Sequence, residues 1–142
     1  MKPQAAAFLE KSRELLDRAD TMLGVALNED AGRTAYLAGF HAAQAFLFET
    51  NGRVFKKHAT VHGEFGRLTK DDPRFDMELR AFLGRAYNLK AIADYETGPG
   101  SRVSAESASA AIRVARRFVE CVANFHSANG HAPQAPDATP KP

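Results

Sequence analysis

The sequence has very little cysteine and no long apolar run. Its single cysteine, Cys121, cannot form a disulfide within the chain, which is typical of proteins from a reducing compartment. The N-terminus carries Lys2 but no continuous apolar segment, so neither a signal peptide nor a membrane span is predicted. These absences predict a cytoplasmic protein that does not insert into a membrane.

Motifs of several large enzyme classes are absent as well. The sequence has no glycine-rich phosphate loop, no cysteine cluster, no nucleophile elbow and no His-Glu-x-x-His pair. His58 and His62 are four residues apart and would share a helix face, but no Asp, Glu or Cys at a matching spacing completes a metal site. The sequence therefore predicts neither a metal nor a cofactor.

Strand signals and internal prolines are also scarce. No period-two alternation of β-branched residues extends beyond a few positions. The seven prolines are Pro3, Pro73, Pro99 and four within the last ten residues, so the long intervals between them lack the strongest helix breaker. The pattern predicts an all-α bundle of four long helices and one short helix. The expected helices span about 3–27, 31–50, 60–68, 73–96 and 105–126.

Polar residues suggest where some of these helices begin. The run Asn28-Glu29-Asp30 supplies candidate caps for the second helix. Asp71 or Asp72 is the expected cap of the fourth, with Pro73 in its first turn. Ser104 is the expected cap of the last helix.

Length and composition describe one globular domain followed by a tail. A chain of 142 residues with 44% hydrophobic content can bury a sizeable core. The net charge of +2 neither requires nor excludes a nucleic-acid partner, so any basic surface must be local. Residues 127–142 are rich in proline and alanine and lack apolar mass to bury, which predicts a disordered tail.

The expected second helix is apolar nearly all round between Tyr36 and Phe48. Such a helix lies in the middle of a bundle or under a subunit interface. Gly39, Ala42 and Ala43 would allow a neighbouring helix to approach closely. His41 and Gln44 stand one turn apart, so they could hydrogen-bond to each other or to a partner.

The stretch 85–96 combines a core face with an unusual outer face. The core face repeats every three or four residues and comprises Phe75, Leu79, Phe82, Ala86, Leu89 and Ala93. The outer face mixes small, aromatic and hydrogen-bonding residues: Arg80, Gly84, Tyr87, Asn88, Ala91, Asp94 and Tyr95. This mixture suits a surface that meets a partner. In the alternative interpretation, Tyr87 and Tyr95 pack at the bundle edge with solvated hydroxyls.

Charged residues within this stretch allow two interpretations. Lys90 and Asp94 are four apart, so their side chains can meet on a helix as a weak exposed ion pair. In a binding site, Lys90 and Arg85 would instead attract phosphate, while Tyr87 and Tyr95 would offer faces for stacking bases.

Two stretches together resemble the HEPN family (higher eukaryote and prokaryote nucleotide-binding domain). Residues 33–47, followed by Lys57-His58, resemble the Arg- and Tyr-bearing second helix of that family. Residues 89–95 carry its Ala-Asp-Tyr signature, and residues 103–106 then open the last helix. The resemblance covers about residues 4–126 and implies an up-and-down helical bundle that forms a homodimer. It also implies a minimal nucleotidyltransferase as partner in a toxin–antitoxin-like pair.

Many HEPN proteins are metal-independent ribonucleases that carry an Arg, four to six residues, and then a His. This sequence departs from that pattern, because Lys90 stands at the usual Arg position and Tyr95 where a four-residue gap would place His. Arg85 is a second arginine, but Ile92 follows it after six residues. A ribonuclease needs one group to take the 2′-hydroxyl proton and another to stabilise the phosphate charge.

The resemblance therefore implies a nucleotide- or RNA-engaging protein, with a ribonuclease of degenerate motif as one form of it. Lys90, Asp94 and Tyr95 are the candidate catalytic residues. Candidate nucleotide- or RNA-binding residues are Arg80, Arg85, Tyr87, Asn88 and His58, of which His58 could also serve as the base. Tyr95 lies near the position at which related proteins carry a tyrosine that the nucleotidyltransferase partner can modify with adenylate. The alternative function is a non-catalytic helical adaptor that docks a partner protein.

Overall fold

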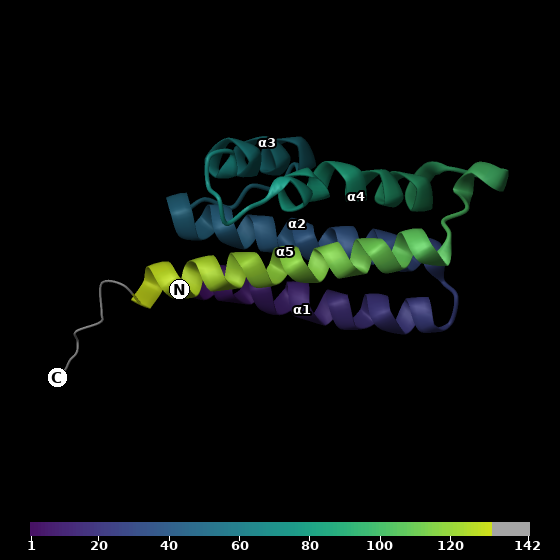
Figure 1. Ribbon diagram of the computed structural model, residues 1–142, viewed down its shortest axis with the longest axis horizontal. Coiled ribbons are helices and arrows are strands. Elements are labelled where there is room, and N and C mark those ends of the chain that lie inside the picture. Colours follow the sequence, from purple (N-terminus) through teal and green to yellow (C-terminus); the bar gives the residue numbers. More distant parts are fainter. Residues whose placement is uncertain (132–142) are drawn as a thin grey trace.

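The chain folds into a helical bundle, seen here in a computed structural model that describes residues 1–131, with side chains described through Ser127 (Figure 1). Within these residues there is no strand, which confirms the all-α prediction. Four long helices alternate in direction, and one short α-helix and a 3-10 turn complete the order. The elements are α1 (Pro3–Gly24), α2 (Asn28–Asn51), α3 (His58–Thr69), α4 (Met77–Tyr95), η1 (Gly98–Ser101) and α5 (Ala105–His131).

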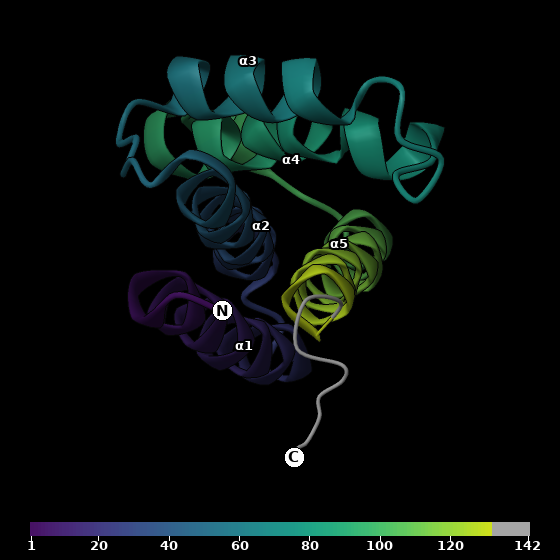
Figure 2. The same cartoon turned by 90° about the vertical axis from the view of Figure 1, so that its left-hand side faces the viewer.

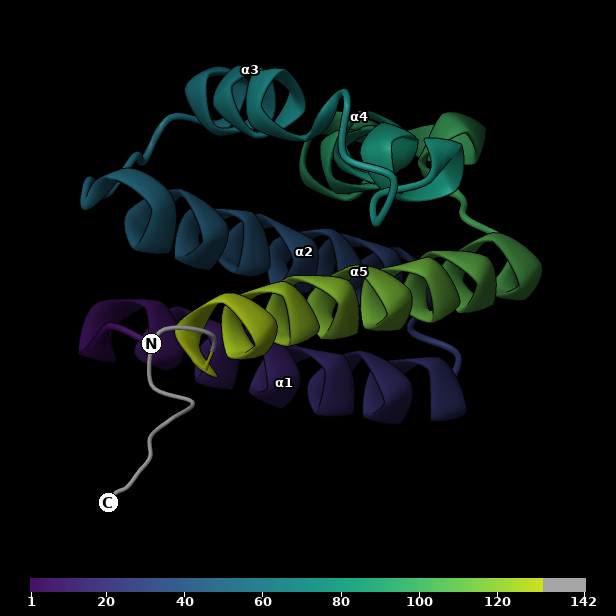
Figure 3. The ribbon, with the colours of Figure 1, turned by 60° about the vertical axis from the view of Figure 1, so that its left-hand side comes forward.

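Helix α2 occupies the centre of the bundle and contacts each of the other four α-helices. Figure 2 looks nearly along α1, α2 and α5 and shows α3 and α4 as a layer on one side of them; Figure 3 shows the same arrangement from the side. Every residue of α2 from Thr34 to Leu47 is buried except the half-buried Leu37 and His41. The central position predicted from its all-round apolarity is confirmed.

A glycine sets the distance between α2 and α4. A Cβ atom built at Gly39 would lie 2.2 Å from Cε2 of Phe82, which is only 3% exposed. The ring of Phe82 therefore occupies the space that any other residue at position 39 would need. Close approach at this point brings the C-terminal half of α4 against the N-terminal half of α2.

Several polar side chains inside the bundle are paired with nearby groups. The predicted bond between His41 and Gln44 is present, with Nδ1 and Oε1 2.7 Å apart. The Gln44 amide also donates to the carbonyl of Phe55 at 2.7 Å, which holds the α2–α3 linker against the bundle. Ser12 on α1 donates to the carbonyl of Ala38 on α2 at 2.7 Å.

The predicted start of the fourth helix was wrong. Asp72 does not cap it; its carboxylate instead accepts from the backbone N–H of Arg74 at 2.9 Å and pairs with the Arg74 guanidinium. This local turn directs Phe75 into the core. The helix begins at Met77, where Asp76 is the cap and accepts from the N–H of Leu79 at 2.9 Å.

Other helix ends differ less from the predictions. Helix α1 ends at Gly24, because Ala26 takes a positive φ of 64° in the turn to α2. The candidate caps of α2 instead lie in its first turn, and the carboxylate of Glu29 accepts from the N–H of Val103 at 2.7 Å. Ser104 caps α5 as predicted, since its hydroxyl accepts from the N–H of Ser107 at 3.0 Å.

The far end of the chain is described only in part. The backbone of α5 remains helical through His131, so it enters the segment 127–142 that was predicted to be a disordered tail. The rest of that segment, 132–142, lies outside the described residues. Among the helices that are described, none is long and apolar enough to cross a membrane.

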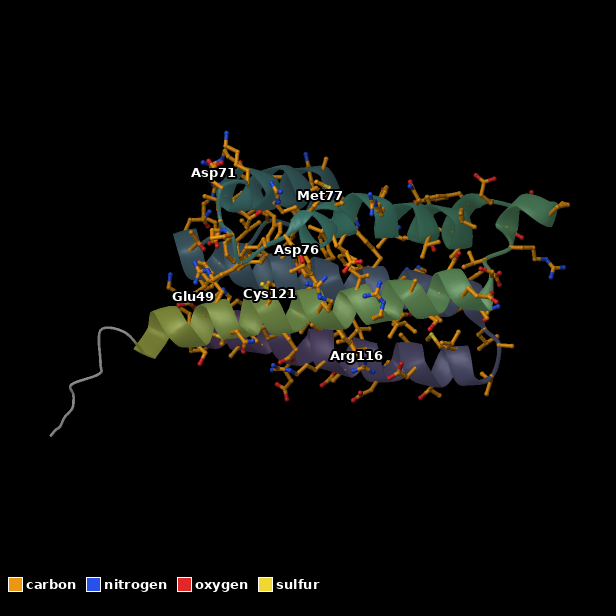
Figure 4. All side chains as sticks on the ribbon, viewed as in Figure 1. Glu49, Asp71, Asp76, Met77, Arg116 and Cys121 are labelled. Carbon is orange, nitrogen blue, oxygen red and sulfur yellow. The ribbon has the colours of Figure 1, made fainter. Side chains whose placement is uncertain are left out.

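Ion pairs join α5 to the helices beside it. Arg117 pairs with Asp76 at 2.8 Å and with Glu78, and Arg113 pairs with Glu78 at 3.3 Å, so the N-terminal turn of α4 is held against α5. On the other side, Arg116 pairs with Asp20 of α1. Figure 4 labels Asp76 and Arg116 on the opposite sides of α5. These three arginines thus tie α5 to α1 and α4 at the surface.

Replacing Gly39 by alanine tests the close approach of α2 and α4. The added methyl group would overlap the Phe82 ring, so the free energy of unfolding should fall by about 1–3 kcal/mol. Gly63→Ala is the control, because Gly63 is an exposed helical glycine whose Cβ would meet nothing within 4 Å. That variant should gain about 0.5–1 kcal/mol from helix propensity. Urea denaturation measures both changes, and equal effects of the two variants would contradict the packing argument.

A buried histidine should make the bundle sensitive to acid. His126 is 2% exposed, its ring stacks on Phe46, and neither ring nitrogen has a hydrogen-bond partner in the described residues. Burial lowers the pKa of His126 in the folded state. The unfolded chain therefore binds more protons as the pH falls below about 6.5. The stability that neutral His126 contributes is present above that pH and is lost as the pH falls through the folded-state pKa.

His126→Phe retains an aromatic ring beside Phe46 and removes this titration. Other ionisable groups are common to both proteins, so their effects cancel in the difference. We expect the free energy of unfolding of the variant, relative to wild type, to rise by about 1 kcal/mol between pH 7.5 and pH 5. A difference that stays constant with pH in urea denaturation would show that His126 does not cause the acid sensitivity.

Candidate functional site

Polar and aromatic side chains from three helices meet where α2, α3 and α4 come together. On α2 they are three residues apart, on α3 four apart, and on α4 three or four apart, so each helix contributes one face. We call this group the junction cluster. It consists of Arg33, Tyr36, His58, His62, Tyr87, Lys90 and Asp94.

One part of the junction cluster is a carboxylate shared by two cations. Lys90 Nζ donates to one oxygen of Asp94 at 2.7 Å, and Arg33 Nε donates to the other at 2.7 Å. The Lys90 side chain is 11% exposed and that of Arg33 is 40% exposed. The ion pair predicted within α4 is therefore present, but its lysine is largely enclosed and a second helix supplies a further cation.

These groups hold one another in their charged forms. The hydrogen bond from Lys90, assisted by Arg33, lowers the pKa of Asp94. The same bond to Asp94 raises the pKa of Lys90. Two cations against one anion leave a net positive charge at neutral pH, and Arg33 is the more accessible cation.

The other part of the junction cluster is centred on a buried phenol. The Tyr36 hydroxyl lies 2.6 Å from Nδ1 of His58 and 2.8 Å from Nε2 of His62. Both imidazoles are half-buried. Burial, followed by proximity to Tyr87, raises the pKa of Tyr36, so the phenol keeps its proton. A hydroxyl can donate one hydrogen bond and accept another, so Tyr36 can link the two histidines in a continuous chain.

Tyr87 connects the two parts. Its ring centroid lies 5.3 Å from that of Tyr36 and 5.5 Å from that of His58. Lys90 Nζ lies 5.8 Å from the centre of the Tyr87 ring and 5.6 Å from that of Tyr95. Burial of the imidazole, and after it the positive charge of Lys90, lowers the pKa of His58. The histidines and the ammonium group therefore belong to one site.

The structure brings together five of the eight residues proposed from the sequence. His58, Tyr87, Lys90 and Asp94 are in the junction cluster, and Tyr95 lies at its edge with 71% of its surface exposed. The remaining three lie elsewhere: Arg80 donates to the carbonyl of Lys70, Arg85 lines a hollow of about 310 Å³ between α4 and α5, and Asn88 is exposed.

Sequence reasoning left three members of the junction cluster out of the site. Arg33 appeared only within the stretch that carries the family resemblance, and Tyr36 otherwise only as the start of an apolar stretch, although a tyrosine within an apolar helix needs a partner for its hydroxyl. The spacing of His58 and His62 was considered only for metal binding. Within the part of the chain with described side chains, no group of three or more His, Cys, Asp or Glu residues could hold a metal ion.

A second feature of α4 is an uncovered stripe on its outer face. Its members alternate in spacing by four and three residues, which places them along one side of the helix. Met77, labelled in Figure 4, and Tyr95 at the ends of the stripe are 74% and 71% exposed, and nothing lies within 4 Å of a Cβ built at Gly84. The stripe consists of Met77, Ala81, Gly84, Asn88, Ala91 and Tyr95. Small residues flanked by larger apolar ones suit close helix packing.

Comparison with known proteins identifies the family of this bundle. Residues 5–125 match the HEPN domain, and the chain belongs to the HEPN family. The match covers almost the whole described bundle, including all seven members of the junction cluster.

Two relatives add to this assignment. The chain is 32% identical over 107 residues to the protein named "Putative toxin MJ0605" of Methanocaldococcus jannaschii, a match that covers 75% of this chain and 79% of the relative. The fold is similar to the crystal structure of TT1696 from Thermus thermophilus, with a TM-score of 0.67 and 21% identity. That likeness covers 87% of this chain and 98% of the solved one. Together with the domain match, the first relative suggests a toxin-like HEPN protein.

Proposed function

We propose that this protein is the RNA-engaging, toxin-like member of a pair whose other member is a minimal nucleotidyltransferase. The main observation in support of this proposal is the net positive charge of Arg33, Lys90 and Asp94 beside tyrosine rings. Cations attract the phosphates of a nucleic acid, while aromatic faces stack on unpaired bases. The name of the archaeal relative supports the toxin-like role.

Each part of the junction cluster has a place in this proposal. Arg33 is the accessible contact for phosphate, and Lys90 behind it adds positive potential. Tyr95 offers an exposed face for stacking next to Lys90. Adenylate transferred to the Tyr95 hydroxyl by the nucleotidyltransferase would add bulk and negative charge at this point, and would thereby oppose RNA binding.

Labelled single-stranded RNA tests the proposal directly. We expect wild-type affinity, measured by fluorescence anisotropy, to fall steeply with salt. Lys90→Gln and Arg33→Gln should weaken binding and flatten its salt dependence, because each removes a cation near the phosphates. Arg18→Gln is the matched control, since Arg18 is an exposed arginine on α1, on the opposite side of α2.

Weak, salt-insensitive binding that is the same for all four proteins would contradict the RNA proposal. It would favour the other function considered for this chain, a helical adaptor for a partner protein.

The proposed assembly is a homodimer formed through the outer stripe of α4. Gly84 leaves room for the backbone of a second helix, and the exposed Met77 at one end of the stripe would become covered. A pair of α4 helices packed in this way would also bring two junction clusters close to one interface.

Light scattering tests this assembly. Wild type at micromolar concentration should have twice the 15.5 kDa chain mass. Gly84→Arg should yield monomers, because a long charged side chain would block close helix packing while its Cβ atom would meet nothing within its own subunit. Gly63→Arg, at another exposed glycine with nothing within 4 Å, should remain dimeric. A monomeric wild type, or a dimeric Gly84→Arg variant, would rule out this interface.

A further inference from the structure

The hydrogen-bond chain around Tyr36 can prepare a histidine to accept a proton. When His58 carries its proton on Nδ1, this N–H donates a hydrogen bond to the Tyr36 oxygen at 2.6 Å. The Tyr36 hydroxyl then donates a hydrogen bond to Nε2 of His62 at 2.8 Å. In this arrangement every group in the chain has a matched donor or acceptor. It also leaves Nε2 of His58, on the opposite edge of the ring, with a free lone pair.

We propose that His58 is the proton acceptor of an RNA-cleaving reaction at the junction cluster, and that Tyr36 and His62 are its positioning residues. This inference rests on the proposed RNA-engaging function and adds the chemistry of the site. It assigns to α3 the base that the Arg-to-His pattern would otherwise supply from α4. His62 and Tyr36 act through His58, in the way that a base in a catalytic triad is oriented by a third group.

The geometry favours His58 over the other ionisable groups. His58 and Lys90 both lie beside the ring of Tyr87, so a base and a cation flank one aromatic side chain. Asp94 is already held by two cations, and its lowered pKa makes it a weak base. Tyr95 projects outward from the edge of the site and is 71% exposed.

The proposed cleavage requires only side chains of the junction cluster, the RNA and water. Nε2 of His58 takes the proton from a ribose 2′-hydroxyl, and the 2′-oxygen forms a bond to the adjacent phosphorus. The bond from phosphorus to the 5′-oxygen of the next nucleotide breaks, and that oxygen takes a proton from water. The products are a 2′,3′-cyclic phosphate and a free 5′-hydroxyl. His58 then releases its proton to solvent, while Arg33 and Lys90 stabilise the phosphate charge.

The surroundings of His58 predict the pH dependence. It faces Tyr36 and His41 on α2, His62 on α3, and Tyr87 and Lys90 on α4. Burial, then Lys90 and His41, lower its pKa. The imidazole is therefore unprotonated at neutral pH and charges only in more acidic solution. Cleavage should be slow in acid, rise through the pKa of His58 below about 6.5, and level off near neutrality.

The same contacts also attach α3 to α2, so the test must separate positioning from folding. Cleavage of an end-labelled single-stranded RNA in EDTA and binding of the same RNA should be measured for each variant, with folding checked by thermal melting. His58→Gln should lower the cleavage rate about 100-fold or more while RNA affinity changes little. Tyr36→Phe and His62→Gln should lower the rate less and shift its pH profile. His126→Phe, which changes a buried histidine outside the site, should cleave like wild type.

Each outcome has a distinct meaning. Loss of cleavage with retained binding in His58→Gln, together with a moved pH profile in Tyr36→Phe, supports the inference. Unchanged cleavage by His58→Gln, or binding without cleavage by wild type, overturns it and leaves the RNA-engaging function standing. Absence of RNA binding by wild type defeats the proposed function and this inference together. If His58→Gln does not fold, a wild-type cleavage rate that does not fall in acid anywhere in the pH range over which the protein stays folded overturns the inference by itself.

Discussion

The contact between Gly39 and Phe82 is the constraint on which the site depends. Because position 39 has no side chain, the ring of Phe82 reaches the backbone of α2 and α4 lies close against it. Farther along the same interface, this approach lets Asp94 of α4 reach Arg33 of α2 and lets Tyr87 meet Tyr36. A wider spacing would separate the charges and aromatic rings that form the junction cluster.

Tyr36 links the stability of the bundle to its proposed chemistry. A fully buried phenol needs a hydrogen-bond partner, and here two histidines of α3 satisfy it. The same contacts hold α3 on α2 and orient His58 with one ring edge free for a substrate. Lys90 also serves both stability and the proposed chemistry. Its ion pair with Asp94 offsets the cost of burying its charge, and Arg33 keeps the local net charge positive.

The central position of α2 and the cap of α5 were predicted correctly from the sequence, whereas the start of α4 was not. The central position of α2 followed from its apolar sequence, because a helix without a polar face can only be covered on all sides. The cap of α5 was also correct, since the Ser104 hydroxyl accepts from the N–H of Ser107. The start of α4 was wrong because Asp72 forms a turn with Arg74, and Asp76 takes the capping position. Three aspartates, Asp71, Asp72 and Asp76, stand in this short segment, and they cannot be ranked as caps without knowing which backbone groups are free.

The sequence by itself determined the class of fold, the order of its helices and the HEPN resemblance, because periodic apolar residues and local motifs depend on neighbours along the chain. It also pointed to His58, Tyr87, Lys90, Asp94 and Tyr95 as candidates. Only the tertiary structure decided that Arg33, Tyr36 and His62 join them and that Arg80, Arg85 and Asn88 lie apart. The reason is physical: which faces of α2, α3 and α4 meet depends on a packing distance set by one glycine and one aromatic ring far apart in the chain.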